Sequence, residues 1–124
     1  MSSTLVPAPG TNLAVLVGSL SRAPEVRVLP SGDEVLTLDV TIRSEGRPTD
    51  SVPVAWTGAP AAAGRWSAGD EVLVVGRVRR RFFRAGGVTQ SRTEVTATVA
   101  VPTRRAAAAG KALHAAVEVI AGRL

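Results

Sequence analysis

Residues 36–43 read Leu-Thr-Leu-Asp-Val-Thr-Ile-Arg, and apolar and polar side chains alternate along them without a break. Successive side chains of a β-strand point to opposite faces, so this pattern places one face on a core and the other in solvent. A helix would need apolar residues three and four positions apart, which this stretch lacks. The segment therefore predicts a half-buried strand, and the neighbouring segments must complete its sheet.

Four further β-type runs accompany this strand, separated by turns rich in glycine and proline, and they cover residues 13–20, 51–56, 71–83 and 88–101. Gly86 and Gly87 predict a hairpin turn between the last two runs, since glycine adopts positive φ without steric cost. The alanine-rich residues 58–69 predict a short helix between the third and fourth strands. Three strands, a short helix and two strands are the element order of the OB-fold, an all-β, five-stranded Greek-key barrel.

Composition divides the chain into three zones. Residues 1–11 are small, polar and proline-containing and predict a flexible leader, and residues 12–101 form the OB-fold domain. Residues 102–124 are rich in alanine and predict a C-terminal helix or tail. An apolar stripe with helical spacing runs through Leu113, Val117, Ile120 and Leu124. We expect this helix to pack on its own or a neighbouring barrel, while a partner-binding helix and a frayed tail stay open.

The residue inventory excludes several kinds of site. The 124 residues include no cysteine and one histidine, His114, which rules out disulfides, thiolate metal sites and cysteine nucleophiles. Acidic pairs such as Asp33-Glu34 have no nucleophile or metal-ligand spacing beside them, so we expect no cofactor, no metal and no enzymatic activity. No apolar run reaches the length of a membrane span, and the first ten residues lack a signal-peptide pattern. This predicts a soluble, cytoplasmic protein with no membrane association.

The charge of the chain points to polyanions. Fifteen basic residues stand against ten acidic ones, a net charge of +5, and every basic residue except Lys111 is an arginine. The arginine side chain pairs with phosphate through two parallel hydrogen bonds and stacks on flat rings, which lysine does not do. An arginine-rich, basic chain indicates nucleic acid as partner. Codon composition is an alternative cause of the arginine excess, so the placement of the arginines must decide.

The richest basic segment is residues 77–84, Arg-Val-Arg-Arg-Arg-Phe-Phe-Arg. Alternate residues of a strand share a face about 6.5–7 Å apart, close to the spacing of phosphates along an extended single strand. One face then carries Arg77, Arg79, Arg81 and Phe83. Cations for the backbone and a ring for a base are what non-specific single-strand binding requires. Phe82 points to the opposite side and is expected in the core, and a charged edge strand that prevents aggregation is the alternative for the whole segment.

Four more arginines are candidates for phosphate contacts. Arg84 begins the hairpin turn and Arg43 ends the polar face of the 36–43 strand, and we expect both to bind nucleic acid. Arg22 and Arg27 flank the first turn, and their role stays open.

The two tryptophans are assigned by strand register. Trp56 faces the core if the alternation from Val52 and Val54 is strict, and it reaches the binding face if the register shifts by one residue. Both alternatives stay open, so Trp56 is kept as a candidate stacking residue. Trp66 is expected to pack in the core.

Several segments, taken in order, resemble a known family. The segments that carry the resemblance are Asn-Leu-Ala-Val-Leu-Val-Gly-Ser-Leu at residues 12–20, Pro-Glu-Val-Arg at 24–27, Gly-Asp-Glu-Val from Gly69 and Thr-Glu-Val at 93–95. With the 36–43 strand, they resemble the bacterial single-stranded DNA-binding proteins over about residues 12–101. The resemblance implies an OB-fold that binds and protects single-stranded DNA without sequence preference in replication, recombination and repair. It also implies a homotetramer, with a dimer as alternative, located at the nucleoid, and a stacking role for Phe83.

Two departures from that family qualify the resemblance. The chain ends Ala-Gly-Arg-Leu at 121–124, where the family typically has an acidic tip that recruits other proteins, so we expect no such recruitment. Ser44-Glu-Gly and Ser51 stand where the family often carries stacking aromatics. An OB-fold protein-interaction module, an accessory subunit of a replication or recombination assembly, is therefore the alternative function.

Overall fold

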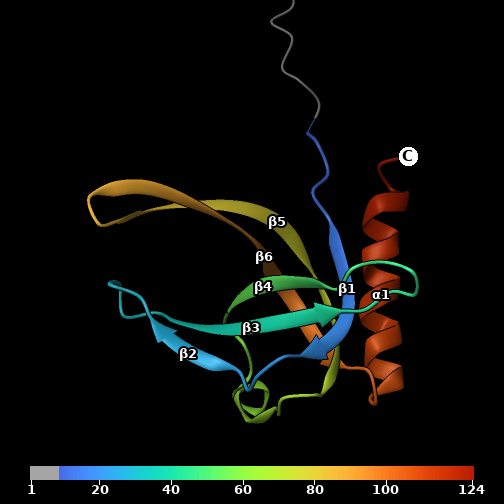
Figure 1. Cartoon of the computed structure of the whole chain (residues 1–124). Helices are drawn as coiled ribbons and strands as arrows, with labels where there is room; N and C mark the ends of the chain where they lie inside the picture. The colour runs from blue at the N-terminus through green and yellow to red at the C-terminus, as the bar shows by residue number, and fades with distance from the viewer. Residues whose placement is uncertain (1–8) are drawn as a thin grey trace, which may run out of the picture.

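The computed structural model of the chain describes residues 9–124, which form six strands, one 3₁₀-helix and one α-helix (Figure 1). The elements are β1 Ala14–Leu20, β2 Glu25–Val28, β3 Glu34–Ile42, β4 Asp50–Thr57, η1 Ala61–Arg65, β5 Glu71–Ala85, β6 Val88–Pro102 and α1 Ala106–Ala121. Most of the leader expected over residues 1–11 lies outside the described part of the chain.

Five of the strands close into a ring. β1 pairs with β5, β5 with β6, β6 with β4, β4 with β3, and the end of β3 returns to β1. All of these pairings are antiparallel except that between β4 and β6, which is parallel. The predicted OB-fold barrel, with its short helix before the fourth strand of the ring, is confirmed. The sequence did not predict β2, a short strand that pairs with the outer edge of β3.

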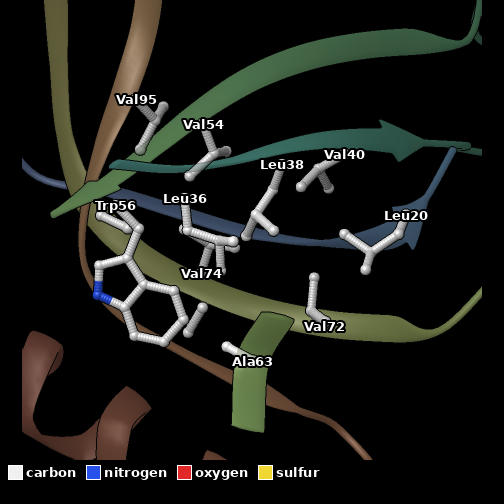
Figure 2. Close-up of a cluster of buried hydrophobic side chains, with 12 residues drawn as sticks. Leu20, Leu36, Leu38, Val40, Val54, Trp56, Ala63, Val72, Val74 and Val95 are labelled. Carbon is white, nitrogen blue, oxygen red and sulfur yellow. The ribbon is translucent and has the colours of Figure 1, made fainter. Parts of the chain in front are cut away.

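The barrel interior holds the alternating apolar residues that defined the strands. The most deeply buried side chains are aliphatic: Leu20, Leu38, Val40, Val72 and Val74 (Figure 2). Ala63 of η1 is fully buried against this cluster, so η1 covers one end of the barrel. Trp56 lies in the same cluster and is 5% exposed, and the partly buried Trp66 packs against it with 5.9 Å between ring centroids. Trp66 therefore packs as expected.

β5 and β6 continue together far beyond the barrel. Their antiparallel pairing runs from Val72 opposite Pro102 to Ala85 opposite Val88, with one register shift between Val75 and Gly76. Both glycines of the Gly86-Gly87 turn have positive φ, as a two-residue hairpin turn requires. Figure 1 shows the resulting two-stranded ribbon projecting from the barrel. We call residues 77–93 the arm.

The C-terminal helix α1 lies against β5 and β6 of its own barrel. The face turned to the sheet is mostly alanine: Ala116 is buried, and Ala108, Ala112 and Ile120 are half-buried. The apolar stripe identified in the sequence is turned mostly outward, with Leu113 44% and Val117 50% exposed. The helix thus turns its small residues toward the sheet, and an apolar cavity of about 570 Å³ lies between them and Val75, Val99 and Val101. No helix within residues 9–124 is long and apolar enough to cross a membrane.

The register shift depends on the absence of a side chain at Gly76. A Cβ at this position would collide with the Thr96 carbonyl oxygen and the Ala97 backbone, whereas a Cβ at Gly110 of α1 would meet nothing. We expect Gly76→Ala to lower the free energy of unfolding by about 1–3 kcal/mol, as overpacking does. Gly110→Ala is the matched control and should raise it by about 0.4–1 kcal/mol through helix propensity and reduced chain entropy. Urea denaturation measures both, and equal stability of Gly76→Ala and the unchanged chain would contradict the close approach.

Candidate nucleic-acid interface

A groove of about 320 Å³ runs over the outer face of the barrel where the arm leaves it. Its floor includes the outward-pointing residues Thr37 and Asp39 of β3 and Pro53 and Ala55 of β4. Its basic side chains come from the first turn, from β2 and from both strands of the arm: Arg22, Arg27, Arg81 and Arg92. The groove therefore joins one face of the arm to the outer face of the β3–β4 sheet.

Arg81 is held in place at the centre of the groove. Its Nε donates a hydrogen bond to Oε1 of Glu94 at 3.0 Å, and Glu94 is only 6% exposed. The Arg81 guanidinium carbon lies 5.3 Å from the centroid of the Phe83 ring, within the range of a cation–π interaction. An acid on one side and a ring on the other restrict the rotamers of Arg81, so its remaining N–H donors are presented in a defined orientation.

Two other groove arginines differ in how well they are paired. Arg22 forms an ion pair with Asp39 at 2.6 Å, and its side chain is 62% exposed. Nε of Arg27 is buried and has no hydrogen-bond partner within residues 9–124. A buried donor without a partner is unfavourable by about 1–3 kcal/mol, so this nitrogen is a local cost to stability at the edge of the groove.

The predicted arginines of residues 77–84 lie as the alternation requires. Arg77 and Arg79 are exposed, while Arg81 and Phe83, which follow on the same side of the ribbon, are half-buried. We call this side of the arm the groove face, because Arg81 lines the groove. Arg84 lies at the tip of the arm, where its guanidinium donates to the Gly87 carbonyl oxygen at 2.8 Å and to Thr89 Oγ1 at 3.4 Å. Arg77, Arg79, Arg81 and Phe83 thus form a row of cations and one ring on one side of the arm, and Arg84 alternates to the other side.

Two other candidates lie apart from this row. Arg43 is exposed just beyond the end of β3 and does not line the groove. Trp56 alternates with Val52 and Val54 toward the barrel interior, so the strict register holds and its ring is buried in the core. A base cannot stack on it in this structure (Figure 2).

The expectation that Phe82 is a core residue is wrong. Its side chain is 66% exposed, because β5 has left the barrel before this position. Alternation along the strand continues through the arm, but no second layer covers the face to which Phe82 points. Alternation of apolar and polar residues predicts to which side of a strand each side chain points. It does not predict whether another layer of the protein covers that side.

Arg92 was not identified from the sequence. The two-residue turn pairs Ala85 with Val88, and counting back along the ladder places Arg92 opposite Arg81. A two-glycine turn in the sequence therefore contains enough information to find it. Within residues 9–124 no group of three or more histidine, aspartate or glutamate side chains is placed to hold a metal ion.

The sequence and the fold were compared with those of known proteins. Residues 11–102 match the single-strand binding protein family. Among solved structures, the chain is similar to the wild-type single-stranded DNA binding protein from Thermus aquaticus, with 25% sequence identity and a TM-score of 0.60. The match covers 74% of this chain and 40% of that protein, so the chain spans less than half of that relative. No curated protein matches the sequence.

The pairing of Arg81 with a buried acid leads to a stability prediction. Glu94→Ala leaves the half-buried guanidinium without its acceptor, and we expect the free energy of unfolding to fall by about 1–3 kcal/mol. Asp39→Ala breaks the exposed Arg22 pair instead and should change stability by at most about 1 kcal/mol, the range of surface ion pairs. Urea denaturation of the two variants provides the comparison. An equal loss in both would show that the Arg81–Glu94 pair is no stronger than a surface contact.

Proposed function

Because the chain belongs to the single-strand binding protein family, we propose that it binds and protects single-stranded DNA without sequence preference. One observation carries the proposal. The arm, residues 77–93, holds six arginines and no acidic residue, and it projects beside a groove lined by further arginines. A surface of this kind attracts the phosphate backbone of any sequence.

The proposed contacts divide the work between phosphates and bases. Same-face arginines about 6.5 Å apart can neutralise successive phosphates, and the Phe83 ring offers a flat surface on which any base can stack. Neither contact reads a base edge, so affinity is independent of sequence. The residues we propose for these contacts are Arg43, Arg77, Arg79, Arg81, Phe83 and Arg84.

The groove extends this surface toward the barrel. Arg27 contributes a positive charge to the wall of the groove, and Arg92 adds a cation opposite Arg81. A single-stranded DNA segment bound in the groove is covered by protein on one side, which blocks reannealing with a complementary strand and attack by nucleases. The function is binding by occlusion, so it needs no cofactor and no reaction step.

An OB-fold interaction module without DNA binding is less well supported. That alternative requires the arginine face to be covered by another subunit or by the C-terminal helix, and within the single chain α1 leaves the exposed Arg79 and Arg84 uncovered. We place the protein where single strands are exposed during replication, recombination and repair, at the nucleoid in the cytoplasm. We also propose that it is a homo-oligomer, a tetramer or a dimer, and light scattering of the purified chain measures which.

The dependence of affinity on salt tests the phosphate contacts. If the five proposed arginines each neutralise one phosphate, log affinity against log salt concentration should have a slope near −3.5, from roughly −0.7 per single-strand contact. Fluorescence anisotropy of a labelled oligo-dT over a series of sodium chloride concentrations measures this slope. A slope near zero would rule out the arginine face as the binding surface.

Stacking and charge can be separated by two substitutions on the same face. Phe83→Ala should weaken oligo-dT binding by about 1–2 kcal/mol with an unchanged salt slope, because it removes a stacking surface and no charge. Arg79→Ala should flatten the slope by about 0.7.

Arg65→Ala serves as the control, since it removes one exposed arginine from η1, away from the arm, and should leave the slope unchanged. Circular dichroism establishes that each variant is folded. If Arg65→Ala and Arg79→Ala flatten the slope equally, binding follows net charge alone and the arm has no special role.

A further inference from the structure

The arm has a second face, of which the contacts proposed above use only Arg84. On β5 it carries Val78, Arg80, Phe82 and Arg84, the residues that alternate with the groove face. The residues opposite these on β6 are Val95, Thr93, Ser91 and Thr89. We call the part beyond Val78 and Val95 the second arm face; it bears two arginines, one aromatic ring and three hydroxyls.

This face is open to solvent. Phe82 is 66% exposed, and the arginines and hydroxyl residues of the face are all exposed. The exposed Phe82 ring stands among the cations and hydroxyls of this face, so it offers a flat surface on which a base can stack. Arg80 and Arg84 flank the ring along the strand at about 6.5 Å on either side.

No acidic side chain offsets these cations. The arm contains no aspartate or glutamate, and Glu94, the first acid after it, points to the groove face and accepts from Arg81. Pairing of this face with a second copy would therefore bring arginines against arginines, which is unfavourable. Phosphates supply the missing negative charge, a base covers the exposed ring, and threonine and serine hydroxyls donate to phosphate oxygens.

A single-stranded DNA segment that stays in the groove cannot contact the second arm face. Phe82 and Phe83 are consecutive and point to opposite sides of a two-stranded ribbon, and the Phe83 ring lies beside Arg81 on the groove side. Gly86 and Gly87 leave the tip of the ribbon without side chains, so a strand can pass over it from one face to the other.

We propose that the second arm face binds a second segment of the same single-stranded nucleic acid, so that a long strand folds over the tip of the arm and contacts both faces. The inference rests on the proposed function. It adds Phe82 as a stacking residue and Arg80 as a phosphate contact. The groove face fills first, because Arg77, Arg79 and Arg81 outnumber the two arginines of the second face.

Oligonucleotide length tests the proposal. An oligo-dT of about 6 nucleotides, one per same-face step, spans a single face of the arm. One of about 30 nucleotides exceeds the roughly 4–16 that one OB-fold covers and can pass over the tip. We expect Phe82→Ala to lower the affinity for the long oligonucleotide about tenfold and to leave the affinity for the short one unchanged. Phe83→Ala should lower the affinity for both. Arg80→Ala should flatten the salt slope by about 0.7 for the long oligonucleotide only.

The outcomes separate this inference from the function on which it rests. If neither oligonucleotide binds the unchanged chain, the proposed function fails. If Phe83→Ala weakens both but Phe82→Ala leaves the long one unaffected, only the second face is refuted. Equal losses on both oligonucleotides in Phe82→Ala would place that ring in the primary site and refute a separate segment. A Phe82→Ala chain that changes mass by light scattering while its DNA affinity is unchanged would make this face a protein contact and also overturn the proposal.

Discussion

The antiparallel pairing of β5 with β6 is the constraint on which the rest of the structure depends. One continuous ladder closes the barrel through β1 and β4, supports α1 on its outer side and then leaves the barrel as the arm. The register shift at Gly76 lies where the ladder passes from barrel to arm, and bulges of this kind bend strands and increase their twist. Beyond it, two-residue alternation alone decides on which side of the ribbon each arginine lies.

Charge and aromatic surface are distributed unequally over this scaffold. Of the four aromatic rings in the chain, Trp56 and Trp66 stabilise the barrel and its η1 cover, which leaves only Phe82 and Phe83 for contact with bases. The arginines are far more numerous, and Arg81 is held by Glu94 before any partner arrives. For the proposed binding of single-stranded DNA, we therefore expect electrostatics, which is sensitive to salt, to contribute more than stacking.

Sequence patterning predicted the barrel well because each strand has a covered face. Alternation from Val52 through Val54 to Trp56, and from Leu36 to Val40, matches residues that lie in one core cluster. The same reasoning misplaced Phe82, since alternation carries no information on where a strand leaves the barrel. The same reasoning applied to α1 was only partly right: Leu113 and Val117 of the predicted stripe are exposed while Ile120 is half-buried, and Ala112 and Ala116 face the sheet.

The apolar surface that remains exposed lies mostly away from the groove face of the arm. Val15 and Val17 of β1 are 41% and 49% exposed, and the outward stripe of α1 adds Leu113 and Val117. Both elements flank β5 on the side where α1 packs, as Figure 1 shows. Exposed apolar side chains favour contact with protein, whereas the arginines of the arm repel another basic arm. The exposed apolar side chains of β1 and α1 therefore lie on a different part of the molecule from the arginine row of the arm, although Val78, Phe82 and Val88 add exposed apolar surface to the arm itself.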